Sequence, residues 1–250
     1  MSDFNNGFTR AAPVAADMSV DAGLRTFMLG VYNKLALGLL WSAVLAYLIY
    51  SVPAVSQIFY STDAATGRLT GITLPGIALQ FAPLVILLGA MFGMKNPSPR
   101  SSGILYWTIV TLIGASASMW LIIYQLGSVA ATFFITAAAF GALSLVGYTT
   151  KKDLTGFGSF LIMAMFGLIA ASLVQMFVNL PGLSFAINVA GVLIFAGLIA
   201  YDTQRLKMTY YALGGNRDGM SVATNYGALS LYINFINLFQ FLLSLFGSRR

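Results

Sequence analysis

One carboxylate, Asp202, stands at the edge of a long apolar segment of this chain. It follows the apolar run 183–201 and precedes Arg205 by three residues. An ionisable group within or beside a membrane helix is costly and indicates function, because it can bind a cation or carry a proton. The alternative is that Asp202 only marks a helix end and pairs with Arg205 one turn further on. The other acidic residues are also aspartates, in the N-terminal arm or in expected loops: Asp3, Asp17, Asp21, Asp63, Asp153 and Asp218.

A second set of polar side chains lies in the last apolar segment, 226–247. At 3.6 residues per turn these side chains form one stripe along a helix. The stripe consists of Tyr226, Ser230, Asn234, Asn237 and Ser244, with Gln240 nearby. A polar stripe cannot face lipid cheaply, so this helix is expected to be central and wrapped by the others. Two roles stay open for it: interhelical hydrogen bonds that only specify packing, or the lining of an ion pathway.

Three residue types are missing from the chain: histidine, cysteine and glutamate. Their absence excludes Ser-His and Cys-His nucleophilic sites and zinc sites that contain histidine. No second membrane aspartate is present to complete an aspartyl active site. We therefore expect no enzyme and no bound cofactor. The net charge of +6 does not indicate nucleic-acid binding, because the basic residues gather in loops on one side of the membrane.

The composition is that of an all-α polytopic membrane protein. Only 8% of the residues are charged, and the mean hydropathy is +0.84; soluble chains carry roughly 25% charged residues. A membrane span needs about 20 mostly apolar residues. Seven segments qualify: 29–51, 72–94, 104–124, 129–149, 157–179, 183–203 and 226–247. Residues 1–26 are predicted to be a flexible arm, residues 27–250 a single seven-helix domain, and 52–71 its one long loop.

The distribution of lysine and arginine predicts the orientation of these spans. One side of the membrane receives Arg10, Arg25, Lys34, Lys95, Arg100, Lys151, Lys152, Arg205, Lys207 and Arg217. The other side receives Arg68, so the N-terminus is expected to be cytoplasmic. Arg249 and Arg250 break this pattern if the last segment crosses fully and restore it if that segment is re-entrant. Since 226–247 has no proline and is long enough to cross at about 1.5 Å per residue, we favour a full crossing.

Four stretches of the sequence resemble the Bax inhibitor-1/YccA family of small polytopic membrane proteins. They are 33–39, 132–154, 195–204 and 228–239, and they include Tyr201-Asp202-Thr203-Gln204 and Ile236-Asn237-Leu238-Phe239 in the correct order. The resemblance covers nearly all of the chain after residue 25. It implies seven helices, six of them wrapped around the last. It also implies a bacterial inner-membrane protein, and we expect a monomer or weak oligomer in the lipid bilayer.

For some members the resemblance implies a pH-sensitive calcium leak, attributed to two facing aspartates on helices six and seven. Asp202 matches the first, but Asn234 stands at the place of the second. Asn234 cannot ionise, although it can donate a hydrogen bond to Asp202 and accept one from Arg205 or water. A basic residue on helix two is thought to latch the closed state, and 72–94 has no charged residue.

The sequence therefore favours a cation leak channel, for calcium or protons, gated near Asp202. Arg205, Asn234, Asn237 and Gln240 would line the pathway, the amide oxygens helping Asp202 to bind calcium. One carboxylate is a poor calcium site by itself, because calcium prefers about six to eight oxygen ligands. The alternative is a non-conducting regulator that binds a membrane-anchored protease, as some bacterial relatives are thought to do. The polar N-terminal arm suggests that second function, since it could be offered to a partner.

Overall fold

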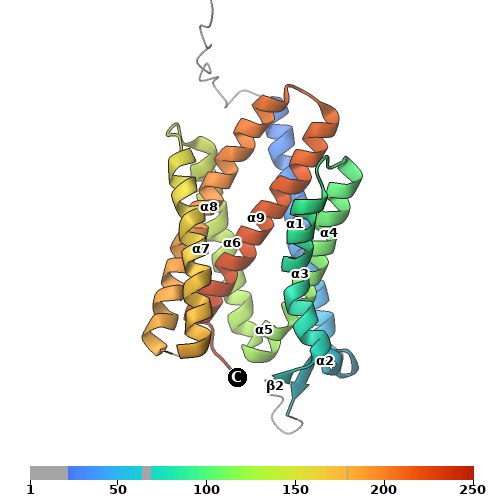
Figure 1. Ribbon diagram of the computed structural model, residues 1–250, viewed down its shortest axis with the longest axis vertical. Coiled ribbons are helices and arrows are strands. Elements are labelled where there is room, and N and C mark those ends of the chain that lie inside the picture. Colours follow the sequence, from blue (N-terminus) through green and yellow to red (C-terminus); the bar gives the residue numbers. More distant parts are fainter. Residues whose placement is uncertain (1–21, 64–68, 179) are drawn as a thin grey trace, which may run out of the picture.

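The computed structural model describes residues 22–63, 69–178 and 180–250, and most of them are helical (Figure 1). The predicted arm lies outside the described residues as far as residue 21. In the described part, seven helical segments are long and apolar enough to cross a membrane, as the sequence predicted. The helices are α1 (Ala22–Ser51), α2 (Pro53–Phe59), α3 (Leu74–Gly93), α4 (Pro99–Ser116), α5 (Ser118–Ile123), α6 (Leu126–Thr149), α7 (Thr155–Val178), α8 (Pro181–Leu213) and α9 (Arg217–Phe246).

Three helices extend past the predicted spans. Helix α1 begins at Ala22, so residues 22–26 of the predicted arm are helical, and Leu24 is fully buried. Helix α8 continues ten residues beyond 203, and α9 begins nine residues before 226. The hydropathy pattern ends where charged residues begin, but buried side chains such as Leu206 continue the helix contacts beyond that point. Asp202 is therefore inside a helix, and the alternative that it marks a helix end is wrong.

A tight turn joins α8 to α9. Gly214 and Gly215 have positive φ angles of 55° and 87°, a conformation that glycine adopts without steric cost. Asn216 then caps α9, because its side-chain oxygen accepts a hydrogen bond from the Gly219 N–H. The two helices consequently run antiparallel with Asp202 facing α9.

The predicted loop 52–71 contains regular structure. It holds α2 and an antiparallel pair of strands, β1 (Tyr60–Thr62) and β2 (Leu69–Ile72), in which Tyr60 pairs with Ile72. The Tyr60 hydroxyl accepts a hydrogen bond from Ser118 Oγ at 3.2 Å, and burial raises the pKa of Tyr60. These contacts fix the two strands against the end of the bundle, whereas the sequence predicted one long loop here.

Helix α9 runs diagonally through the bundle and packs against α1, α4, α6 and α8 (Figure 1). Helix α3 packs mainly on α4, and α7 mainly on α8, so α9 packs chiefly on α1, α4, α6 and α8 and is not wrapped evenly by six helices. At the far end, the Arg250 N–H donates to the Ile123 carbonyl at 3.0 Å. Arg250 thus lies opposite the α8–α9 turn, and α9 runs from one end of the bundle to the other, as the favoured full crossing predicts.

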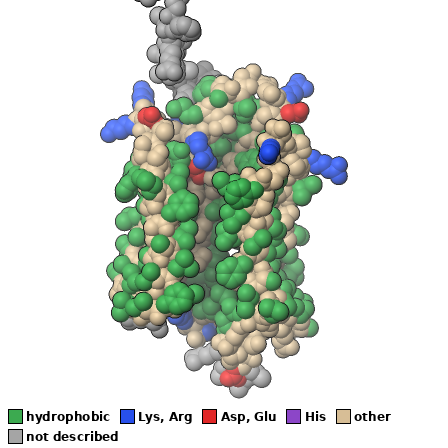
Figure 2. All heavy atoms as spheres, in the orientation of Figure 1, with side chains coloured by type: hydrophobic (Ala, Val, Ile, Leu, Met, Phe, Trp, Pro, Cys, Tyr) green, Lys and Arg blue, Asp and Glu red, His purple; other side chains and the backbone are tan. Residues whose placement is uncertain are grey.

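The two ends of the bundle differ in charge. We call the end with the α8–α9 turn the basic end, and the end with Arg249 and Arg250 the C-terminal end. Lysine and arginine side chains gather at the basic end, and apolar side chains cover the flanks (Figure 2). Near the basic end α6 and α8 cross at Gly147, where a Cβ atom would overlap the carbonyl of Ala200. This close approach holds α8 in place two residues before Asp202.

Candidate functional site

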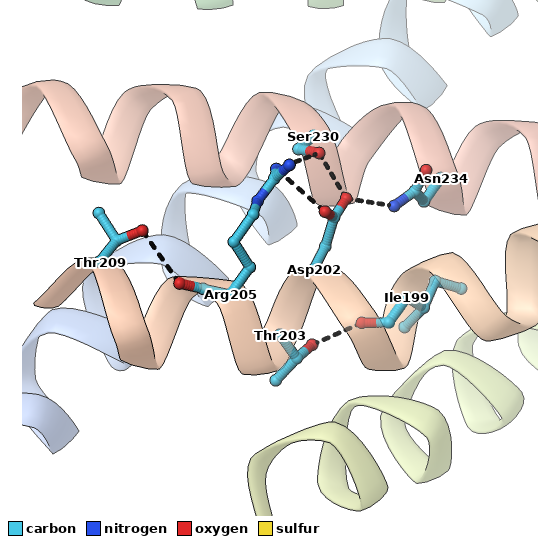
Figure 3. A network of polar contacts seen from close by, with 7 residues as sticks. All are labelled: Ile199, Asp202, Thr203, Arg205, Thr209, Ser230 and Asn234. Carbon is cyan, nitrogen blue, oxygen red and sulfur yellow. Dashed lines mark hydrogen bonds and ion pairs between the residues drawn. The ribbon is translucent and has the colours of Figure 1, made fainter. Parts of the chain in front are cut away.

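The Asp202 carboxylate lies between α8 and α9 and is only 5% exposed (Figure 3). Its Oδ2 accepts hydrogen bonds from Ser230 Oγ at 2.5 Å and from Asn234 Nδ2 at 2.7 Å, both on α9. Its Oδ1 pairs with Arg205 Nη2 at 2.9 Å. Hydrogen bonds to an ionised group are short and strong. The three donors therefore hold the carboxylate in one position against α9.

Arg205 closes this network on its outer side. It lies one turn after Asp202 on α8, and its side chain is 48% exposed. Its Nη2 also donates to Ser230 Oγ at 3.3 Å, and its guanidinium lies 5.6 Å from the centre of the Tyr201 ring. The cost of burying a carboxylate falls when a cation and hydrogen-bond donors face it, and Asp202 has both. Arg205 supplies that cation while remaining in contact with the exterior.

The polar stripe of α9 delivers two of the three donors. Ser230 and Asn234 are one helical turn apart, so they present their side chains to Asp202 together. The predicted hydrogen bond from Asn234 to Asp202 is present. Arg205 bonds Asp202 and Ser230 rather than Asn234, because the carboxylate is the stronger partner for a guanidinium. The sequence placed Ser230 in the stripe but not in the site; its spacing from Asn234 was the available signal.

The rest of the predicted pathway does not join this network. Asn237 is half-buried and donates to the carbonyl of Ile233 on its own helix at 2.8 Å. Gln240 is exposed and lines a separate pocket toward the C-terminal end. Between that pocket and Asp202, the rings of Phe195 and Phe241 stack at 5.8 Å. The structure therefore brings Asp202, Arg205 and Asn234 together and leaves Gln240 apart from them.

The next turn of α8 fixes the connection between α6 and α7. Gln204 Oε1 accepts from the Leu154 N–H at 2.8 Å, and its Nε2 donates to the Lys152 carbonyl at 2.7 Å. Lys207 is buried and donates to the carbonyl of Tyr148, near the C-terminal end of α6, where a cation is favoured. The sequence pattern predicted neither of these contacts, although Gln204 belongs to the motif that contains Asp202.

In that connection, Asp153 accepts a hydrogen bond from the Thr155 N–H at 2.8 Å at the start of α7. Hydrogen bonds from the hydroxyl and the backbone N–H of Thr155 hold the pKa of Asp153 below its usual range. Asp153 is fully exposed, so it differs from Asp202 in solvation as well as in partners.

A second polar cluster joins α1, α4 and α9. Lys34 Nζ donates to Asn225 Oδ1, and Asn225 Nδ2 donates in turn to Ser102 Oγ at 2.8 Å. The Tyr106 hydroxyl donates to the Lys34 carbonyl at 2.6 Å.

The described residues contain no group of three or more His, Cys, Asp or Glu side chains that could hold a metal ion. Among the described residues, Asp202 therefore has a guanidinium, an amide and a hydroxyl beside it rather than further carboxylates.

Residues 24–250 match the family described as Inhibitor of apoptosis-promoting Bax1. Three relatives are similar over almost their whole length. An uncharacterised protein of Caulobacter vibrioides is 64% identical over 100% of both chains. An uncharacterised protein of Rickettsia prowazekii is 41% identical over 92% of both chains. The inner membrane protein YbhL of Escherichia coli K12 is 40% identical over 92% of this chain and 94% of its own.

Proposed function

Because the chain belongs to the Bax inhibitor-1 family of integral membrane proteins, we propose that it is a gated cation leak pathway in the inner membrane. The gate is the pair of Asp202 and Arg205, and the pathway follows the α8–α9 interface. The observation that carries this proposal is a buried carboxylate whose only charged partner in the described part of the chain is a half-exposed guanidinium. A cation that replaced the guanidinium would find an anionic oxygen already held between two helices.

The geometry corresponds to a closed state. Arg205 occupies the position at Oδ1 that a passing cation would need. Two ammonium groups in the same half of the bundle, the half-buried Lys34 and the buried Lys207, donate to neutral oxygens and add positive charge there. Farther along the interface, the stacked rings of Phe195 and Phe241 present no polar atom to an ion. Conduction therefore requires Arg205 to leave and the α8–α9 interface to loosen.

Arg205 is suited to that movement. Long basic side chains keep their charged group in water while their stem lies on apolar surface, so an exposed arginine can turn outward at small cost. Ser230 and Asn234 would remain on Asp202, since they belong to the other helix. Asp202 Oδ1 and Ser230 Oγ would then be open to a partly hydrated cation. Calcium would need most of its six to eight oxygen ligands from water. A proton would need only the Asp202 Oδ1 atom.

The test is flux into vesicles that contain the purified full-length protein. Calcium and proton entry are measured from about pH 5 to about pH 8, the range in which physiological switches act. Wild type should conduct, Asp202→Asn should fall to the level of protein-free vesicles, and Asp153→Asn should match wild type as a control for the same chemical change. Asn234→Asp places two carboxylates together, which share a proton, so its flux should depend on pH more steeply.

Absence of flux in wild type and in every variant over this range would exclude the leak function. Equal flux in wild type and Asp202→Asn would exclude Asp202 as the gate while leaving conduction intact. Regulation of a membrane-anchored protease stays a prediction that depends on residues 1–20, which lie outside the described residues. Its test is deletion of those residues, which should abolish co-purification with the protease.

A further inference from the structure

A polar pocket of about 480 Å³ opens between α7, α8 and α9 at the C-terminal end. Its polar lining includes Gln175, Ser184, Asn188, Gln240, Ser244 and Arg249. Polar groups in a membrane helix are costly unless they meet protein partners or a polar cavity. Only part of this set is satisfied inside the protein: Asn188 Nδ2 donates to Ser244 Oγ at 3.0 Å. The pocket has the volume of a small-molecule site and lies apart from Asp202.

The pocket lies near the ends of two apolar helices, the level at which lipid headgroups are expected. Gln175 is one turn from the end of α7 at Val178, and Ser184 is one turn from the start of α8. Around it the surface is strongly apolar, with Phe177, Phe185 and Phe246 largely exposed. A polar hollow beside lipid-facing aromatic side chains matches an amphiphile, whose headgroup would enter the pocket while its chains follow the apolar flank.

The charge of the pocket favours an anion. Among the described residues, Arg249 is the only charged one that lines it, and no carboxylate does. The Arg249 backbone pairs with Tyr124 in a β-bridge, and its guanidinium lies 5.8 Å from the centre of the Tyr124 ring. Both contacts hold the guanidinium near the pocket, and guanidinium groups bind phosphate oxygens in a bidentate manner. A cation would be repelled here, so the pocket is not an entrance for the proposed leak.

Gln175 adds a hydrogen-bond acceptor to the pocket. Its Oε1 is buried and accepts no hydrogen bond in the described part of the chain. A buried acceptor without a donor is destabilising, and a ligand that donates to it would remove that cost. An ammonium or hydroxyl group would satisfy it, and phospholipid headgroups carry such groups next to their phosphate.

We propose that this pocket binds the headgroup of a phospholipid, with the phosphate on Arg249 and a headgroup ammonium or hydroxyl on Gln175. Helix α7 packs mainly on α8, so the bound lipid would connect α7 to α9 across the pocket. The lipid would therefore stabilise the assembled bundle. This inference does not depend on ion conduction.

The experiment measures thermal unfolding of the full-length protein in detergent, together with retained lipid by native mass spectrometry. Four additives are compared: phosphatidylethanolamine, phosphatidylglycerol, diacylglycerol and inorganic phosphate. The two phospholipids should raise the unfolding temperature and leave one bound molecule, whereas diacylglycerol, which lacks phosphate, should do neither. Arg249→Gln and Gln175→Leu should each weaken retention about tenfold, the effect of one lost hydrogen bond with a charged group. Arg250→Gln, the matched control, should bind as wild type does, because Arg250 does not line the pocket.

Equal stabilisation by diacylglycerol, or undiminished binding in Arg249→Gln, would overturn the proposal. A full effect from inorganic phosphate alone would make the site one for free phosphate and reject the lipid. Equal losses in Arg250→Gln and Arg249→Gln would mean that any terminal positive charge suffices, which also rejects a built pocket. Flux in the vesicle assay should be unchanged in Arg249→Gln, so failure of this proposal and failure of the leak function give different results.

Discussion

The two ends of the α8–α9 interface treat buried polar groups in opposite ways. At the basic end Asp202 has three donors, and its network is closed by protein atoms alone. At the C-terminal end the pocket beside Gln175 leaves a buried oxygen without a donor. The stacked rings of Phe195 and Phe241 separate the two regions. In lipid, a closed network specifies how helices pack, whereas an incomplete one indicates a place for something else to bind.

The largest difference in stability between the two regions is expected where a glycine that allows close backbone packing is replaced by alanine. Gly147→Ala would push a methyl group into the Ala200 carbonyl, next to the Asp202 network. Because backbone must move to relieve that overlap, we expect a loss of at least about 3 kcal/mol of unfolding free energy, at the upper end for overpacking. Gly182→Ala, close to the polar pocket, meets no atom within 4 Å and should change stability by less than about 0.5 kcal/mol.

Thermal unfolding in detergent, with the yield of folded protein, measures both glycine variants. A second control, Gly141→Ala, lies on the same helix as Gly147 and also meets no atom within 4 Å. If all three variants are equally stable, then the basic end is not closely packed in solution and the contrast between the two regions fails.

Replacing one asparagine in each region should give the next largest difference in unfolding free energy. Asn234→Leu removes one donor from a buried carboxylate, a loss of about 1–3 kcal/mol. Asn188→Leu removes the bond to Ser244 beside an open polar pocket, and membrane hydrogen bonds of this kind average about 0.6 kcal/mol. Chemical unfolding of both variants in the same detergent measures the difference. A larger loss for Asn188→Leu would show that the C-terminal end, not Asp202, is the ordered part of the interface.

Part of this contrast could be predicted from the sequence, and the parts that could not be predicted have physical causes. The 3.6-residue period correctly placed Ser230 and Asn234 on one face of the last helix, and the family resemblance placed Asn234 opposite Asp202. Helix ends were missed, since α8 continues past its charged residues on contacts such as Leu206 with Gly227. Gln240 was assigned to the same pathway because it lies near the stripe. No periodicity indicates that an aromatic stack between Phe195 and Phe241 interrupts the polar path.

The pocket could not be predicted from the sequence, for a different reason. Its lining combines two neighbouring helices, α7 and α8, with the end of α9 and Arg249, which come much later in the sequence and reach the pocket through packing alone. The Asp202 site, by contrast, requires only two helices connected by one tight turn. Local patterns predict contacts across one hairpin; they do not predict where a third helix leaves space.

Arg205→Gln should sharpen the distinction between a gate and a packing contact. The variant loses the ion pair but leaves Ser230 and Asn234 on Asp202. Because the arginine is half-exposed, we expect a stability loss of about 1 kcal/mol or less. Flux in vesicles should nevertheless rise above wild type, since the cation that blocks Oδ1 is gone. A stability loss greater than that of Asn234→Leu, with unchanged flux, would make Arg205 a structural residue only.

The smallest expected effect concerns Asp153, the exposed counterpart of Asp202. Because hydrogen bonds from Thr155 hold the pKa of Asp153 below its unfolded value, its contribution to stability is present above that unfolded value and is lost as the pH falls through the folded pKa. Asp153→Asn should therefore be slightly less stable than wild type near neutral pH, and the difference should shrink on acidification. Unfolding temperatures of both proteins from about pH 7 to about pH 3 measure this difference, and subtraction removes the titration of other carboxylates. A difference that grows toward low pH would mean that the Thr155 contact favours the protonated carboxyl. That result would contradict the prediction that hydrogen bonds from Thr155 stabilise the charged form of Asp153.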